Sequence, residues 1–130
     1  MKTQAILRID PASTLPVYRQ IVDGIRTLLV DRQLNPGDAL PTVRELALEL
    51  GVHFNTVAEA YRLLSSEGWL DLRRRRGAVV TARETPEPTP EMREQFNSRL
   101  RLLVSQMRSE GLSIEVILSE LDGLRAELTK

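Results

Sequence analysis

The sequence predicts a mostly α-helical protein with one small β-hairpin, in which an N-terminal domain is followed by a two-helix C-terminal tail. Apolar residues recur at helical spacing over most of the chain, and two short alternating runs flank an arginine-rich turn. A segment that alternates proline with polar residues separates the two parts. With 130 residues, 42% of them hydrophobic and 28% charged, the composition is that of an ordinary globular protein.

The first predicted helix begins at Pro16 and ends near Arg32. Proline suits the first turn of a helix, and the turn-forming run at residues 35–38 indicates that the helix has ended before it. The predicted buried face is an amphipathic stripe formed by Ile21, Ile25, Leu28 and Leu29.

Two further helices are separated by a very short turn. The second helix begins at Thr42, which can form a capping box with Glu45, and it stops at Gly51. The third helix runs from about Phe54 to Glu67, and its predicted buried stripe is Val57, Ala60, Tyr61 and Leu64. Two helices joined by a short glycine-containing turn are typical of a helix-turn-helix.

A β-hairpin is predicted to complete the N-terminal domain. Residues 69–72 alternate like a strand, and residues 78–81 can return as a second strand. Residues 73–77 form the predicted turn between them, and four consecutive arginines lie in that turn. The composition is low in aromatic residues, at 4%, so Trp69 is predicted to be part of the core rather than a platform for nucleic-acid bases.

The proline-rich segment at residues 83–90 is predicted to be an extended linker between a domain at residues 9–82 and a tail at residues 91–130. The tail contains two helical stripes, separated by Gly111 and a capping Ser113. Two helices of this length cannot bury both stripes alone, which favours a homodimer over docking on the first domain. The predicted dimer contacts are Leu100, Leu103, Met107, Ile114, Ile117, Leu121 and Leu124.

The motif P-G-D-A-L-P-T-V-R-E-L-A at residues 36–47 resembles the winged-helix domain of GntR-type bacterial transcription regulators. The resemblance continues through residues 50–70 and covers about residues 9–82, while the short tail resembles the YtrA-like branch of that family. It implies a winged helix-turn-helix domain in a sequence-specific regulator that binds double-stranded DNA. It also implies a homodimer on a palindromic operator, and repression is favoured because occluding polymerase requires no further contacts.

The resemblance also implies which residues contact DNA. In the family, the arginine after the L-P-S/T motif, the first residues of the recognition helix and the tip of the wing reach the DNA. Relatives usually carry R-G-x-G-T in the wing, whereas Arg75 and Ala78 stand at the first glycine and the threonine here. The predicted DNA-binding residues are Thr42, Arg44, His53, Phe54, Asn55, Thr56, Arg74, Arg75, Arg76 and Gly77.

The chemistry of these side chains fits DNA, although each has a plainer alternative. Arg44 can pair with guanine or, alternatively, with a surface carboxylate. Asn55 and Thr56 can bind adenine and phosphate, or they can cap a helix. His53 can contact DNA or act as a cap, and Phe54 can press on a thymine methyl group or pack against the preceding helix. The wing arginines suit a narrow minor groove, the alternative being a solubilising turn.

Composition excludes several other classes of function. The chain has no cysteine, one histidine and a formal net charge of zero, so we expect no cofactor, no metal site and no enzymatic activity. No apolar run is long enough to span a membrane, and the first residues are unlike a signal peptide, which predicts a cytoplasmic protein.

Two alternatives concern the partners of the protein. A winged-helix domain can instead contact protein or RNA without recognising an operator. Regulators also couple effectors to DNA binding, and an unidentified small effector is predicted to bind near Leu103, Met107 and Ile117.

Overall fold

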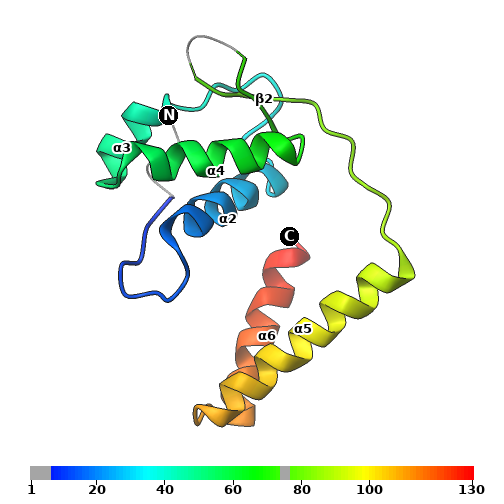
Figure 1. Ribbon diagram of the computed structural model, residues 1–130. Coiled ribbons are helices and arrows are strands. Elements are labelled where there is room, and N and C mark those ends of the chain that lie inside the picture. The colour runs from blue at the N-terminus through cyan, green and yellow to red at the C-terminus, as the bar shows by residue number, and fades with distance from the viewer. Residues whose placement is uncertain (1–6, 74–76) are drawn as a thin grey trace. The chain divides into compact units, whose positions relative to one another are not determined.

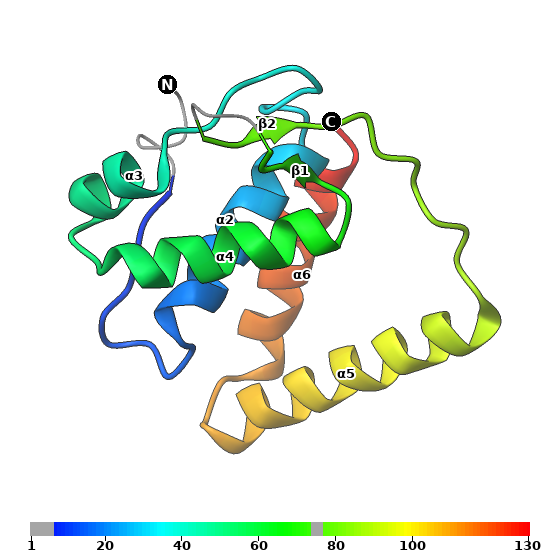
Figure 2. The ribbon, with the colours of Figure 1, turned by 45° about the horizontal axis from the view of Figure 1, so that its top comes forward.

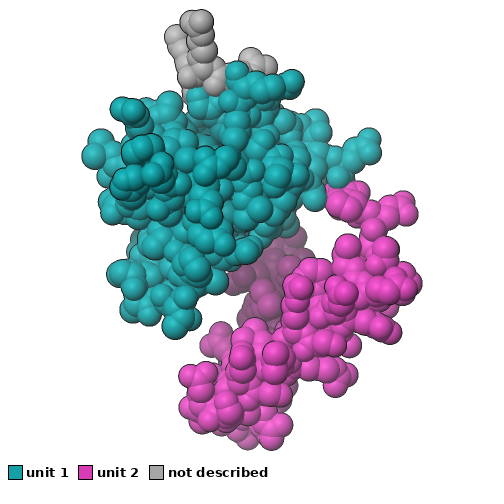
Figure 3. Space-filling view, viewed as in Figure 1, with its two compact units in different colours: residues 1–84 teal, residues 85–130 magenta. Residues whose placement is uncertain are grey.

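The computed structural model describes residues 7–73 and 77–130, and the chain divides into two compact units, residues 1–84 and 85–130 (Figure 3). The described part is mostly helical with one two-stranded antiparallel sheet, which confirms the predicted fold class. Unit 1 contains α2 (Val17–Val30), α3 (Val43–Leu50), α4 (Phe54–Ser66), β1 (Leu70–Asp71) and β2 (Val79–Val80). Unit 2 contains α5 (Pro90–Ser109) and α6 (Ile114–Leu128).

Helix α2 begins after Pro16 and ends two residues before the predicted end near Arg32. Arg32 adopts a left-handed backbone conformation with a φ of 61°, and this is where the chain turns away from the helix. The turn signal further along is also real, because the Asp38 N–H donates to the Asn35 carbonyl over 2.9 Å. The chain therefore makes two consecutive turns between α2 and α3.

Helices α3 and α4 form the predicted helix-turn-helix. The capping box is present: the Glu45 N–H donates to Thr42 Oγ1 over 3.1 Å, and the Thr42 N–H donates to Glu45 Oε1 over 2.9 Å. Gly51 ends α3 in the left-handed conformation, with a φ of 69°. Helix α4 packs against both α2 and α3 (Figures 1 and 2).

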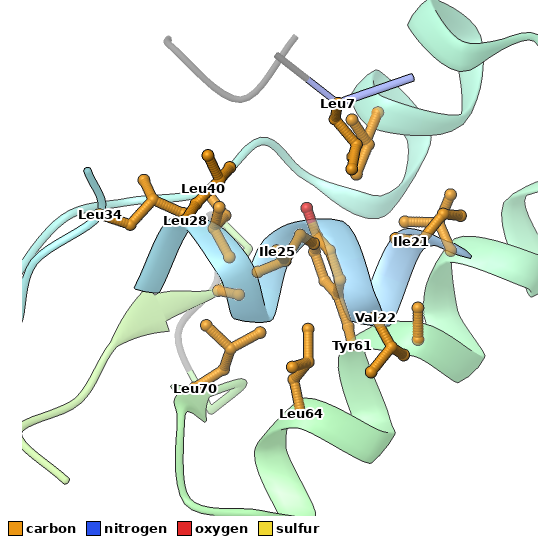
Figure 4. Packing of buried hydrophobic residues seen from close by; sticks show 14 of the residues in the cluster. Leu7, Ile21, Val22, Ile25, Leu28, Leu34, Leu40, Tyr61, Leu64 and Leu70 are labelled. Carbon is orange, nitrogen blue, oxygen red and sulfur yellow. The ribbon is translucent and has the colours of Figure 1, made fainter. Parts of the chain in front are cut away.

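The core of unit 1 lies between α2, α4 and the sheet, with Tyr61 among the side chains that meet there (Figure 4). Every residue of the two predicted stripes in α2 and α4 is buried, since both helices present one apolar face inward. The largest side chains that are almost completely buried are Tyr61, Ile21, Ile25, Leu46, Leu64, Val22 and Val57. Trp69 is half-buried against this core.

The wing is built from a shorter sheet than the sequence predicts. Only Leu70 and Asp71 pair with Val80 and Val79, whereas four-residue strands were expected on each side. The other edge of β2 is occupied by the segment at residues 37–40, which sequence reasoning left unpaired. The Leu40 N–H donates to the Ala78 carbonyl over 2.8 Å, and the Gly37 N–H donates to the Val80 carbonyl over 2.8 Å.

Two arginines fasten the end of α4 within unit 1. Arg26 of α2 donates from Nη2 to both carboxylate oxygens of Glu67 over 2.8 Å, and its Nη1 donates to Asp23 over 3.1 Å. Arg83 donates from Nε to the Glu67 carbonyl over 2.9 Å, and its Cζ lies 4.1 Å from the centroid of the Trp69 ring. The last residues of unit 1 are therefore held against the end of α4.

Unit 2 consists of two capped helices joined by a short turn. Thr89 caps α5 and Ser113 caps α6, each by accepting a backbone N–H, and the Ser113 cap confirms the prediction. Because Pro90 is the first residue of α5, the extended segment ends at Thr89. The two helices diverge from the turn (Figures 1 and 2). Most of their apolar side chains are consequently exposed.

Candidate DNA-binding surface

The start of α4 is organised by His53. Its Nδ1 accepts the Asn55 N–H over 3.1 Å, which makes His53 the N-cap residue of the helix. The alternative in which Asn55 and Thr56 cap α4 is therefore wrong, because they follow the cap in the first turn. Within residues 7–73 and 77–130, their side chains make no hydrogen bond, and Asn55 is exposed. Both side chains are available to a ligand at the positive end of the helix dipole.

Arg44, in the first turn of α3, lies near Phe54, which stacks with His53 at the start of α4. The Arg44 Cζ is 5.9 Å from the centroid of the Phe54 ring, and the His53 and Phe54 ring centroids are 4.8 Å apart with planes inclined by 24°. Phe54 is 46% exposed, so it is not a core residue. In the described part of the chain Arg44 forms no ion pair, and the alternative of a surface salt bridge is therefore wrong there.

Thr42, one of the predicted DNA contacts, is the N-cap residue of α3. The backbone N–H of Thr42, followed by its hydroxyl, stabilises the Glu45 carboxylate and holds the pKa of Glu45 below its usual value. The Thr42 hydroxyl oxygen also accepts the Glu45 N–H. Thr42 lies two residues before Arg44, so the cap also fixes where Arg44 leaves the helix.

Gly77 brings the end of the wing against the start of α3. It adopts a φ of +95°, and a Cβ atom there would lie 3.2 Å from the Thr42 Cα. The position therefore requires glycine for two reasons, backbone conformation and close approach. The predicted contacts Arg74, Arg75 and Arg76 lie outside the described residues.

Arg73, the first arginine of the wing, forms an ion pair on the surface with Asp71. Its Nε and Nη2 donate to the Asp71 carboxylate, each over 3.1 Å. This hydrogen bonding, together with the charge of Asp71, raises the pKa of Arg73. Its guanidinium thus has fewer free donors than that of Arg44.

Tyr61 joins the two helices of the helix-turn-helix, a role that the sequence did not reveal. Its hydroxyl donates to the Pro41 carbonyl over 2.8 Å, next to the Thr42 cap. Burial, with smaller contributions from the Glu45 and Glu49 carboxylates, raises the pKa of Tyr61. The phenol therefore remains a hydrogen-bond donor well into alkaline solution.

The predicted dimer contacts in unit 2 differ in exposure. Ile117 is buried, with 4% of its surface exposed, and Met107 is half-buried. The other five are between 38% and 55% exposed: Leu100, Leu103, Ile114, Leu121 and Leu124. A groove of about 400 Å³ in this unit is lined by Leu100, Val104, Leu121 and three polar residues, and it excludes the residues predicted to bind an effector.

Among the described residues, no helix has both the length and the apolar character that a membrane span requires. No cluster of three or more histidine, aspartate or glutamate side chains that could hold a metal ion is found among the same residues.

Residues 17–80 match the family model of the gntR family of bacterial regulatory proteins. Over 110 residues the chain is 31% identical to the HTH-type transcriptional repressor YtrA of Bacillus subtilis (strain 168), and the match covers 85% of each chain. The chain belongs to the GntR family. It is a DNA-binding transcription regulator, and unit 1 carries its winged helix-turn-helix.

Three solved structures align with this chain. A transcriptional antiterminator from Listeria monocytogenes EGD-e aligns with a TM-score of 0.71 and 26% identity over 98% of this chain and 92% of that one. YtrA from Sulfolobus acidocaldarius aligns with a TM-score of 0.56 and 33% identity over 95% and 99%. The DNA-binding domain of AraR in complex with operator ORX1 aligns with a TM-score of 0.51 and 27% identity over 57% and 98%.

Proposed function

We propose that this GntR regulator is a repressor that binds a palindromic operator as a homodimer. The observation that carries the proposal is that several side-chain hydrogen-bond donors without a partner among the described residues lie close together at the start of α4. Arg44 from α3 lies beside the first turn of α4, where the side chains of Asn55 and Thr56 make no hydrogen bond among the described residues. Such a helix start fits the major groove of DNA. The proposal contains no catalytic step and places the protein in the cytoplasm.

Each donor matches a part of the DNA. The Arg44 guanidinium can bind guanine O6 and N7 together, and the Asn55 amide can bind adenine N6 and N7. The Thr56 hydroxyl, at the positive end of the helix dipole, suits a phosphate. His53 would add a contact next to them. These assignments divide the surface into residues that read bases and residues that hold the backbone.

The wing supplies the second element of the interface. Gly77 adjoins Thr42, so the wing leaves the domain next to the start of α3. Arg74, Arg75 and Arg76 follow Arg73, and the sequence of this turn favours a narrow minor groove with its concentrated negative potential. We assign these three arginines to sequence-independent affinity.

Dimerisation rests on the exposed apolar stripes of unit 2. Leu100 and Leu103 on α5 are each 52% exposed, and Ile114, Leu121 and Leu124 follow one another on a single face of α6. Helices that diverge from their turn cannot cover these faces within one hairpin, and exposed apolar stripes at 3–4 spacing suit a second helical hairpin of the same kind. A symmetric dimer also matches the symmetry of a palindrome.

The dimer is tested by measuring molar mass in solution by light scattering. Wild-type protein should have twice the chain mass of 14.7 kDa, and Leu103→Arg should shift the mass toward one chain. Leu102→Arg is the matched control, because Leu102 is 60% exposed but lies off the stripe. A monomeric wild type, or equal behaviour of the two variants, would refute the proposed interface.

Operator binding is tested by fluorescence anisotropy with a duplex that the protein itself selects from random-sequence DNA, and with a scrambled duplex. Arg44→Ala should cost about 1–3 kcal/mol on the selected duplex and little on the scrambled one. Neutralising Arg74 and Arg76 should weaken both duplexes evenly and flatten the dependence of affinity on salt. An affinity that does not change with salt concentration would overturn this division of roles and favour protein or RNA contact. So would an equal loss of affinity for both duplexes in the Arg44 variant and in the wing variant.

An effector is a further part of the proposal, since regulators couple ligands to DNA binding. The groove of about 400 Å³ that is lined by Leu100, Val104 and Leu121, together with three polar residues, is the candidate site. A screen of small molecules should find one that raises the melting temperature of the wild type and fails to do so after Val104→Trp fills the groove. A ligand that stabilises both proteins equally would place the site elsewhere.

A further inference from the structure

The aromatic residue at the start of α4 has no role in the core. Phe54 is 46% exposed at the first position of the helix, whereas the buried face of α4 is complete without it. Its ring instead lies between two neighbours: His53, stacked at a centroid distance of 4.8 Å, and Arg44, with Cζ 5.9 Å from the ring centroid. We call Arg44, Phe54 and His53 the junction stack.

The ring orients Arg44 without consuming its hydrogen-bond donors. An arginine can be fixed by a carboxylate, as Arg26 is by Glu67, but its N–H groups are then already occupied. A guanidinium held near the face of an aromatic ring keeps all five N–H donors for another partner. In the described part of the chain no carboxylate pairs with Arg44. The junction stack thus limits the directions of this side chain and leaves its donors free.

His53 is fixed by the same ring and by the helix. Its Nδ1 accepts the Asn55 N–H over 3.1 Å, so that nitrogen carries no proton and the neutral ring carries its proton on Nε2. The stacked Phe54 ring restrains the rotation of the imidazole. The two neighbours of the Phe54 ring are therefore a guanidinium and an imidazole N–H donor, both suited to acceptors on DNA.

We infer that Phe54 is a positioning residue for operator recognition: it acts through Arg44, by holding the guanidinium for a base, and makes no base contact of its own. The inference rests on the proposed function, since it requires that Arg44 reads a base. Preorganising a long side chain before binding reduces the conformational entropy that binding would otherwise cost. In the junction stack, therefore, Arg44 is the residue that contacts a base, and Phe54 holds it in position.

A double-mutant cycle tests the inference in the full-length protein with the selected and scrambled duplexes. Phe54→Ala should weaken binding to the selected duplex by about two- to fivefold if the junction stack stays in contact with water in the complex. The loss should reach about thirtyfold if the bound DNA excludes water from the stack, because a cation–π contact is stronger without water. The affinity of the variant for scrambled DNA should stay unchanged. In the Arg44→Ala background, Phe54→Ala should have no further effect. Phe54→Trp, which keeps an aromatic face, should restore affinity.

Two controls separate positioning from folding. Leu48→Ala removes an apolar side chain that is 85% exposed on α3, one turn beyond Arg44, and it should leave DNA binding unchanged. Unfolding followed by Trp69 fluorescence should show the same urea midpoint for Phe54→Ala and wild type. A loss of stability equal to the loss of affinity would reduce Phe54 to a structural role.

The failures of the two proposals are distinguishable. A wild-type protein that binds selected and scrambled duplexes equally refutes the proposed function before any variant is compared. If wild type discriminates between them but Phe54→Ala costs the same factor with and without Arg44, Phe54 touches DNA itself and the inference is overturned. Loss of binding to both duplexes by Phe54→Ala would also overturn it.

Discussion

Replacing Tyr61 by phenylalanine should loosen the helix-turn-helix without emptying the core. Tyr61 is 1% exposed, and its hydroxyl donates to the Pro41 carbonyl over 2.8 Å. Phenylalanine keeps the ring that fills the space between α2 and α4 but cannot donate. Pro41 is itself buried, so its carbonyl would lose this donor in a place where water cannot easily replace it.

The expected loss of stability follows from this geometry. Leaving a buried acceptor without a partner costs about 1–3 kcal/mol, and we expect the lower half of that range because the cavity left by one oxygen is small. For a domain of 60–100 residues, each kcal/mol lowers the melting temperature by about 4–8 °C. Because the lost bond holds Pro41 next to the Thr42 cap, operator affinity should also fall while the salt dependence stays the same.

The stability that the Tyr61 hydroxyl contributes should depend on pH in alkaline solution. The folded pKa of Tyr61 is raised above the unfolded value of about 10, so its contribution is complete below that pH and is lost as the pH rises toward the folded pKa. The stability difference between wild type and Tyr61→Phe should therefore be constant from about pH 6 to pH 9 and should shrink above about pH 10.

Urea unfolding followed by the fluorescence of Trp69 measures this difference, because Trp69 is the one tryptophan in the chain and lies in unit 1. Tyr18→Phe is the matched control: Tyr18 is half-buried in α2, and its hydroxyl makes no hydrogen bond among the described residues. Equal urea midpoints for wild type and both variants would show that the Tyr61–Pro41 bond stabilises nothing.

Three other substitutions test local features of the surface. Glu45→Gln keeps an acceptor for the Thr42 N–H but removes the carboxylate whose pKa is lowered in the folded protein. Wild type should lose the stability contributed by that carboxylate as the pH falls through its folded pKa, whereas the variant should show no such loss. Urea midpoints of both proteins between about pH 3 and pH 7 measure the difference. Gly77→Ala, at a φ of +95° and facing the Thr42 Cα, should destabilise unit 1 by about 1–2 kcal/mol and weaken DNA binding in anisotropy titrations. His53→Ala should cost about 1 kcal/mol in thermal unfolding, whereas His53→Asn should keep the cap and the stability.

The parts of the fold that the sequence predicts are those fixed by neighbours in the chain. Thr42 and Glu45 are three residues apart, and their capping box depends on nothing beyond α3. Ser113 caps α6 and Gly51 ends α3 in the same local way. Apolar periodicity identified the buried faces of α2 and α4 because a helix repeats its geometry at every turn.

The parts that escaped prediction depend on contacts across the chain. Arg26 meets Glu67, 41 residues away, and the pairing of Ala39 with Val79 adds a third segment to the wing. Histidine is not among the usual N-cap residues, so the sequence alone left the role of His53 open. Nothing in the spacing of Arg44 and Phe54 indicated that the first turn of α3 would lie beside the start of α4.

The two units differ in how they cover apolar surface, and this difference suggests how DNA binding and assembly are coupled. Unit 1 buries the apolar faces of α2 and α4 in its own core. Among the described residues of unit 2, Ile117 is the one buried hydrophobic side chain. A partner chain would therefore bury most apolar surface by packing against α5 and α6, and it would change the junction stack little. Operator affinity should then depend on protein concentration through unit 2, whereas base preference should stay constant, because we assign it to Arg44 and the start of α4 within each chain.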